Sequence, residues 1–232
     1  MNYGRAIFLL LNRREQNAHG RLTAYHSSAV RGKWYALNKF VPAHSGGMAV
    51  NMQGDIEEIL IGRDTIKKMV HEMGSKISRD YEGKELILVG VLKGGFVFLA
   101  DLMREITIPV DMDLIAVSSY GTSTRSSGVV RIIKDIDMNV ADKHVLIVED
   151  LVDTGLTLKH LKELFHTRGP LSVKICTAFD KPSRRKVDIE IEYKGMEVPD
   201  KFIVGYGLDF AGKYRNLPDI CTLKSQVYKG SV

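Results

Sequence analysis

The residues most able to do chemistry lie in one short run near the middle of the chain. Glu149 and Asp150 precede residues 153–157, which carry a third acid, a glycine and two threonines. A turn of this composition at the start of a helix exposes backbone N–H groups at the positive end of the helix dipole, where phosphate binds well. Carboxylates next to a phosphate would repel it unless they face another part of the ligand. The run therefore predicts a ligand with a phosphate and, beside it, sugar hydroxyls, a bound cation or a proton to be removed.

The elements that must position this run can be read on either side of it. Residues 145–148 are apolar and mostly β-branched, which predicts a strand buried on both faces. Leu158, Leu161, Leu164 and Phe165 then recur at helical spacing. The three acids and the turn are thus expected to connect a buried strand to a helix.

The same alternation of strand and helix extends along most of the chain. Ile66, Met69, Val70, Met73 and Ile77 predict one face of a helix that begins near Asp64, and a second helix passes through residues 98–103. Further strands are expected at residues 86–89, 113–117, 129–133, 173–178, 202–204 and 220–223. This order predicts an α/β fold with a doubly wound parallel sheet, whose ligands bind at the carboxyl ends of the strands. The regions of Gly94, Asp150, Lys181 and Asp209 should therefore gather at one edge.

One loop between these strands is unusually polar. Residues 118–128 are rich in glycine, serine and threonine, and Tyr120 is their one large apolar anchor. This composition predicts a mobile flap near the ligand.

Composition excludes several classes of protein. Hydrophobic residues make up 44% of the 232-residue chain and charged residues 26%, which supports one domain with a sizeable core. Cys176 and Cys221 lie in apolar runs without metal-ligand spacing, so we expect buried thiols in a reducing, cytoplasmic compartment. No apolar run approaches the ~18 residues of a membrane span, so a membrane partner is not expected.

The net charge of +5 is unevenly distributed. Residues 1–51 hold seven basic residues and one acidic residue, a net charge of +6, which leaves −1 for residues 52–232. A nearly neutral body does not predict a nucleic-acid partner. We therefore divide the chain into an extension, 1–51, expected to be poorly ordered, and a catalytic domain, 52–232. Three interpretations of the extension stay open: a start codon assigned upstream of Met48 or Met52, a natural extension, or a targeting leader.

The run Glu149-Asp150-Leu-Val-Asp153-Thr-Gly-Leu-Thr157 resembles the signature of the type I phosphoribosyltransferases, and in particular of those that use hypoxanthine and guanine. The resemblance extends from about residue 56 to about residue 223. It implies a type I phosphoribosyltransferase fold with a small hood formed by the terminal segments. It also implies a purine salvage enzyme that transfers the phosphoribosyl group of phosphoribosyl pyrophosphate to hypoxanthine or guanine, releasing IMP or GMP and pyrophosphate. Such enzymes use Mg²⁺ and form homodimers or homotetramers.

The resemblance assigns a role to each motif. Asp153 is the expected general base, facing N7 of the purine. Glu149, Asp150 and Asp209 are the expected magnesium ligands. The residues expected to bind phosphoribosyl pyrophosphate are Lys93, Gly94, Ser119, Tyr120, Glu149, Asp150, Asp153, Thr154, Gly155, Leu156, Thr157 and Arg215. Those expected to bind the purine are Lys181, Phe202, Ile203 and Asp209.

Physical arguments support some of these roles independently. Glycine at 94 and 95 lets a backbone approach a pyrophosphate closely, and the guanidinium of Arg215 matches a phosphate in geometry. A lysine ammonium at position 181 can donate to the 6-oxo group of hypoxanthine or guanine, whereas adenine carries an amine there. Phe202 and Ile203 read by periodicity alone as core residues of a strand.

Two other functions fit the same residues. One is a regulator that senses phosphoribosyl pyrophosphate and binds nucleic acid, which the presence of Asp153, Lys181, Phe202 and Arg215 disfavours. The other is a phosphoribosyltransferase that prefers xanthine, which shares the 6-oxo group and N7 with hypoxanthine. The sequence does not rank hypoxanthine, guanine and xanthine as substrates.

Overall fold

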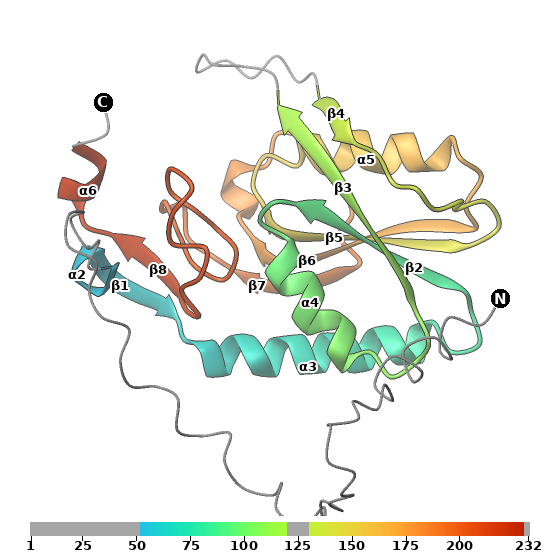
Figure 1. Cartoon of the computed structure of the whole chain (residues 1–232), viewed down its shortest axis with the longest axis horizontal. Helices are drawn as coiled ribbons and strands as arrows, with labels where there is room; N and C mark the ends of the chain where they lie inside the picture. The colour runs from blue at the N-terminus through green and yellow to red at the C-terminus, as the bar shows by residue number, and fades with distance from the viewer. Residues whose placement is uncertain (1–51, 120–129, 230–232) are drawn as a thin grey trace, which may run out of the picture. The chain divides into compact units, whose positions relative to one another are not determined.

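A six-stranded sheet forms the centre of the computed structural model, which describes residues 52–119 and 130–229 (Figure 1). The strand order is β4-β3-β2-β5-β6-β7. Their bounds are β2 (Leu86–Leu92), β3 (Asp111–Ser119), β4 (Val130–Lys134), β5 (His144–Val152), β6 (Ser172–Asp180) and β7 (Tyr193–Glu197). Neighbouring strands pair in parallel except for β4, which pairs antiparallel with β3 at the edge. The predicted α/β fold with a mostly parallel sheet is confirmed.

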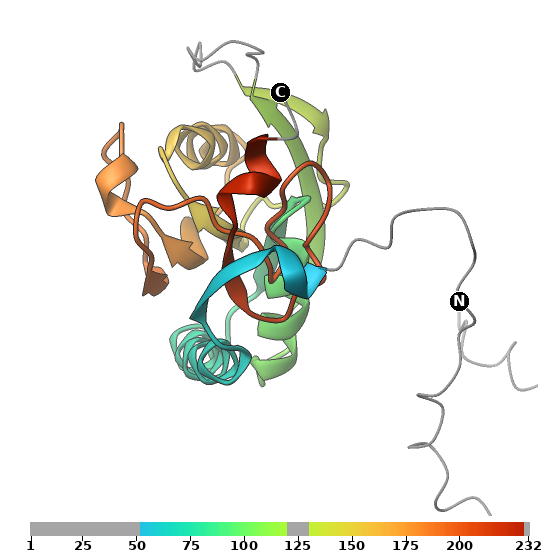
Figure 2. The ribbon, with the colours of Figure 1, turned by 90° about the vertical axis from the view of Figure 1, so that its left-hand side faces the viewer.

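Helices cover both faces of this sheet. Helices α3 (Arg63–Asp80) and α4 (Phe96–Glu105) pack on one face, and α5 (Leu156–His166) packs on the other. Figure 2 shows α3 and α5 on opposite sides of the strands. The strands alternate accordingly: in β2, Leu88 joins the core under α3 and α4, whereas Val89 joins the core under α5.

A second, smaller sheet is built from the two ends of the described chain. Strand β1 (Ile56–Ile61) pairs antiparallel with β8 (Ile220–Leu223), flanked by α2 (Met52–Asp55) and α6 (Ser225–Lys229). Figure 1 shows this pair at the left, beside the long loop that connects β7 to β8. It corresponds to the small hood expected from terminal segments.

Two strand predictions differ from the structure in ways that bear on the site. Strand β5 continues past residue 148 to Val152, because its backbone pairs with β6 as far as the register Val152↔Asp180. The acids at 149 and 150 therefore lie on a strand and not in the turn. Residues 202–204 do not form a regular strand, since Val204 makes only an isolated bridge to Cys221.

Several sequence predictions fall on residues that the structure does not describe. Most of the predicted flap, including Tyr120, lies within residues 120–129, and the proposed extension is residues 1–51. Ser119 is the last residue described before the gap. None of the helices in residues 52–119 and 130–229 is both long and apolar enough to cross a membrane.

Candidate active site

A cavity of about 390 Å³ lies at the carboxyl edge of the main sheet and contains most of the predicted site residues. It is lined by the loop after β2, the end of β5, the residue after β6 and the loop between β7 and β8. The predicted residues that line it are Lys93, Gly94, Glu149, Asp150, Asp153, Thr157, Lys181, Phe202, Ile203, Asp209 and Arg215. A second cavity of about 210 Å³ extends over the turn and adds Thr154 and Gly155. Leu156 lines neither cavity and is the first residue of α5.

The turn at the start of α5 has the geometry expected of a phosphate site. Gly155 is the N-cap residue, with a φ of +80° that favours glycine. Without a side chain it cannot accept hydrogen bonds from the first N–H groups of the helix, although Thr154 Oγ1 accepts one from Leu156 N–H at 3.5 Å. The remaining N–H groups and the helix dipole are directed toward an anion at this end.

Glu149 and Asp150 are adjacent acids near the end of β5. Asp150 is buried and Glu149 is partly buried. Burial and the neighbouring Asp150 carboxylate raise the pKa of Glu149 well above its usual range. Burial raises the pKa of Asp150 too, although its hydrogen bonds oppose the shift. Ligands that supply positive charge or hydroxyl donors would stabilise this pair in its ionised form.

Asp153, which lines the cavity, forms an ion pair with Arg184. Arg184 Nε donates to Asp153 Oδ1 at 2.9 Å, and a second nitrogen of the same guanidinium lies 3.7 Å from an Asp200 oxygen. Arg184 belongs to the short 3-10 helix η2 (Pro182–Arg184) that follows β6. The contact with Asp153 raises the pKa of Arg184 above its usual range.

Lys181 is a buried lysine whose ammonium group reaches the same cavity. Its Nζ donates to the backbone carbonyl of Lys201 at 2.6 Å. Burial lowers its pKa, although Asp153 and Asp200 act in the opposite direction. A buried ammonium that already binds one carbonyl oxygen can donate to a second carbonyl oxygen on a ligand.

An aromatic side chain forms part of the wall beside Lys181. Phe202 is 49% exposed, an unusually high value for a phenylalanine, and its ring packs edge-to-face on Phe210 at 5.6 Å between centroids. Ile203 is buried. The exposed face of Phe202 provides a flat apolar surface on which a ring compound can stack.

Asp209, predicted as a magnesium ligand, and Arg215, predicted to bind the pyrophosphate, are paired with each other. Arg215 Nη2 lies 2.6 Å from Asp209 Oδ1, and Gly212 N–H donates to Asp209 Oδ2 at 2.7 Å. Arg215 also donates to the carbonyl of Gly207 at 2.6 Å. Both Asp209 oxygens thus have protein partners, and a cation bound there would share a carboxylate that already balances the charge of Arg215.

The donor set suits a cation that arrives with its ligand. Among the described residues, no group of three or more His, Cys, Asp or Glu side chains could hold a metal ion. Mg²⁺ usually keeps several waters and binds one or two carboxylates together with substrate phosphates. The Glu149–Asp150 pair beside the phosphate turn fits that pattern, whereas an all-protein metal cage does not.

Sequence reasoning missed two arginines that belong to this edge. Arg184 contacts Asp153, and Arg185 pairs with the buried Asp180 while its side chain lies against Gly155. The signal was present in the run Pro182-Ser183-Arg184-Arg185-Lys186, directly after Lys181. Its contacts could not be read from the sequence because the partners are up to 31 residues away.

The fold and site together define a protein that binds a phosphorylated sugar and a flat ring compound in one cavity. A model of the phosphoribosyl transferase domain matches residues 57–211. The hypoxanthine-guanine phosphoribosyltransferase of Bacillus subtilis (strain 168) is 51% identical over 178 residues, covering 77% of this chain and 99% of that protein. The crystal structure of a hypoxanthine phosphoribosyltransferase from Staphylococcus aureus superimposes with a TM-score of 0.75 at 46% identity, covering 78% and 99% of the two chains. The chain therefore belongs to the phosphoribosyltransferase family, among its hypoxanthine-guanine members.

Proposed function

We propose that this enzyme transfers the 5-phosphoribosyl group from phosphoribosyl pyrophosphate to N9 of hypoxanthine or guanine, giving IMP or GMP and pyrophosphate. One observation carries the proposal beyond family membership. A single cavity of about 390 Å³ is lined on one side by Lys181 and Phe202, which are expected to bind the purine base. Its other side is lined by the acids Glu149 and Asp150, next to a helix N-terminus. The donor and the acceptor of the transfer can therefore meet within it.

On the purine side, three side chains have complementary roles. Lys181 donates to the 6-oxo group, which selects hypoxanthine and guanine over adenine. The ring of Phe202 stacks on the purine, and the backbone of Ile203 meets the edge of the base. Asp153 accepts the N7 proton as N9 attacks. The support is that Lys181, Phe202, Ile203 and Asp153 all line the cavity.

On the donor side, residues 153–157 hold the 5-phosphate, while Glu149 and Asp150 bind the ribose 2- and 3-hydroxyls. Lys93, Gly94 and Arg215 hold the pyrophosphate. The bond between C1 of the ribose and the pyrophosphate oxygen breaks, and the electron pair leaves with pyrophosphate. The N9–C1 bond forms, and the N7 proton passes to Asp153, so atoms and charge balance. We assign Ser119 and Tyr120 to the segment that excludes water during transfer.

Magnesium is the proposed cofactor, which Glu149 and Asp150 would hold together with the substrate, with Asp209 as a further ligand. When bound, it neutralises charge on the departing pyrophosphate. Glu149 and Asp150 both line the cavity, which supports a cation at this position.

The test is a panel of five bases, each mixed with phosphoribosyl pyrophosphate and Mg²⁺, with pyrophosphate release as the readout. Hypoxanthine and guanine should react, while adenine and uracil should not. A higher rate with xanthine than with hypoxanthine and guanine would change the proposed substrate but leave the proposed transfer reaction unchanged. No turnover with any base would remove the proposed function.

We also propose a catalytic domain of residues 52–232 that acts in the cytoplasm as a homodimer or homotetramer. Two buried free cysteines, Cys176 and Cys221, suit a reducing compartment. In a 40% identical hypoxanthine phosphoribosyl transferase from Trypanosoma cruzi, the C-terminal region has a role in the oligomeric state and enzymatic activity. Sedimentation of this protein with and without substrates would establish its own assembly.

A further inference from the structure

The segment that follows Lys181 runs alongside the signature turn and is hydrogen-bonded to it on both sides of Asp153. Lys181 N–H donates to the Val152 carbonyl at 2.9 Å, and Lys186 N–H donates to the Thr154 carbonyl at 3.0 Å. These two bonds fix residues 181–186 against residues 152–154. The side chain of Arg184 projects from this segment at the position of Asp153.

The resulting ion pair is exposed but geometrically constrained. The Arg184 side chain is 47% exposed and that of Asp153 42%, so their attraction contributes little to folding. The guanidinium has two acidic partners, Asp153 Oδ1 at 2.9 Å and Asp200 at 3.7 Å, and Arg184 is the last residue of η2. A carboxylate held by one oxygen cannot rotate freely about its χ angles.

The other carboxylate oxygen is the one left for a ligand. Within the described part of the chain, Asp153 Oδ2 has no hydrogen-bond donor, and Asp153 lines the cavity beside Lys181. The charged groups near Asp153 are Arg184, Asp200 and Lys181, and of these Lys181 lines the cavity with Asp153 whereas Arg184 and Asp200 do not. Because Arg184 occupies Oδ1, we expect Oδ2 to be the oxygen presented to the base.

We propose that Arg184 is a positioning residue for phosphoribosyl transfer, which holds Asp153 so that Oδ2 meets the purine N7 proton. The proposal rests on the assignment of Asp153 as the base in the function proposed above. Arg184 itself does not touch the substrate and acts only through Asp153. The proposal adds residue 184 to the site, in the segment 181–186. The sequence had placed only Lys181 of this segment in the site, as a purine-binding residue.

The experiment is a double-mutant cycle between Arg184 and Asp153, measured on the full-length protein with hypoxanthine. Arg184→Ala should lower kcat/KM for hypoxanthine by about 10-fold, because a misplaced base loses alignment, with KM for phosphoribosyl pyrophosphate within about 2-fold. Arg184→Lys, which keeps a donor and the charge, should recover part of the loss. In an Asp153→Asn background, Arg184→Ala should change kcat/KM by less than about 2-fold.

Two controls separate positioning from a structural role. Arg79→Ala, on the exposed side of α3, should leave kcat/KM unchanged. The melting temperature of each variant is measured alongside, and Arg184→Gln replaces the alanine variant if the latter does not fold.

Two results would overturn the proposal. One is an Arg184→Ala enzyme with normal kcat/KM for hypoxanthine. The other is an equal loss from Arg184→Ala with Asp153 present and with Asn in its place, which would mean that Arg184 acts independently of the base. A wild-type protein that turns over no base would instead remove the proposed function itself, so the two failures are distinguishable.

Discussion

The Asp150 carboxylate lies against the backbone of Gly94, in the space that a β carbon on residue 94 would occupy. The two residues come from neighbouring strands, since Asp150 is near the end of β5 and Gly94 follows the end of β2. The acidic pair and the loop proposed to hold pyrophosphate are therefore packed together, and neither can be displaced without the other.

Gly94→Ala tests this contact. The added methyl group would displace the Asp150 carboxylate or the loop, so we expect a loss of about 10²-fold in kcat from misalignment alone. Steady-state pyrophosphate release measures it. Gly62→Ala is the matched control, because no atom lies within 4 Å of a β carbon there. Equal activity of the two variants would show that the Gly94 contact is not required.

Arg185→Met tests the buried pair behind the phosphate turn. Asp180 is almost fully buried and pairs with Arg185, with Lys194 farther away at 3.8 Å. Removing the guanidinium leaves a buried carboxylate poorly compensated, which costs about 3–5 kcal/mol of unfolding free energy. Because the Arg185 side chain also lies against Gly155, KM for phosphoribosyl pyrophosphate should rise.

Urea unfolding and steady-state kinetics measure the two effects of Arg185→Met. Arg79→Met, an exposed arginine on α3, is the control for the substitution itself. Restoration of stability by adding Asp180→Asn would support the buried charge as the cause, and an unaltered unfolding free energy for Arg185→Met alone would contradict it.

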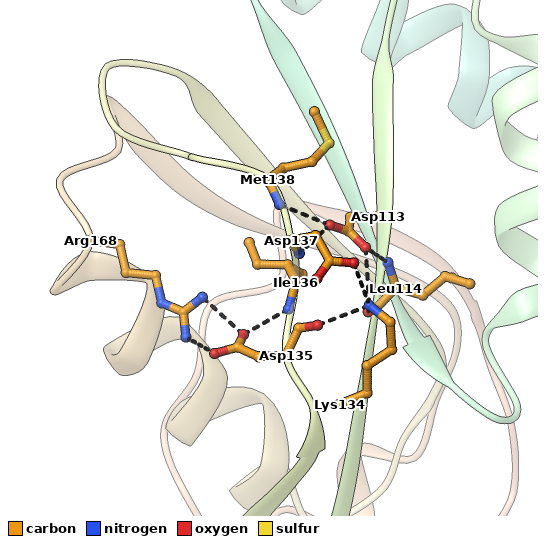
Figure 3. A network of polar contacts seen from close by, with 8 residues as sticks. All are labelled: Asp113, Leu114, Lys134, Asp135, Ile136, Asp137, Met138 and Arg168. Atoms are coloured by element: carbon orange, nitrogen blue, oxygen red, sulfur yellow. Dashed lines mark hydrogen bonds and ion pairs between the residues drawn. The ribbon is translucent and has the colours of Figure 1, made fainter.

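Acid should weaken a polar network that links the strand β4 to the end of α5 (Figure 3). Arg168 donates two hydrogen bonds to the Asp135 carboxylate, at 2.9 and 2.7 Å, and this contact lowers the pKa of Asp135. A lowered folded-state pKa means that the stabilisation is present above the unfolded pKa of about 3.9 and is lost as pH falls through the folded value.

Asp135→Asn should therefore reduce the unfolding free energy by about 1 kcal/mol at pH 7. The difference from wild type should shrink as pH falls below the unfolded pKa of about 3.9, and it should vanish only below the lowered folded-state pKa, where both proteins carry a neutral side chain. Urea titrations at pH 7 and at a series of acidic pH values measure this. Asp137→Asn is the control, since that side chain is 91% exposed. A difference that persists unchanged in acid would remove the ion pair as its cause.

Deleting residues 1–47 should leave turnover intact. The family model begins to match at residue 57, and the relatives align with about 77% of the chain. The deleted and full-length proteins should show equal kcat with hypoxanthine. An insoluble or inactive product would show that the division at residue 52 is wrong.

The fold was largely predictable where apolar periodicity is strong. The five apolar residues assigned to one face of α3 are all buried, and β8 has its expected bounds. The strand β7, with the sequence YKGME, lacks an apolar run because it is an edge strand, and it was not predicted. Phe202 read as a core residue by periodicity, but it is half exposed at the cavity.

The site was predictable only in part, for a physical reason. Residues 149–157 carry their chemistry in one continuous run, so composition and order suggest a phosphate and its neighbours. The pairs Asp153–Arg184 and Asp209–Arg215 depend on how segments pack in three dimensions, which no spacing along the chain reveals. The specific roles of Phe202 and Ile203 came from resemblance to a family.

The most direct test of the account is the stoichiometry of products formed from hypoxanthine and phosphoribosyl pyrophosphate with Mg²⁺. We predict IMP and pyrophosphate in equal amounts, with no ribose 5-phosphate accumulating, because the cavity brings the base to the anomeric carbon in place of water. Release of pyrophosphate without IMP, or failure to form either product, would contradict it.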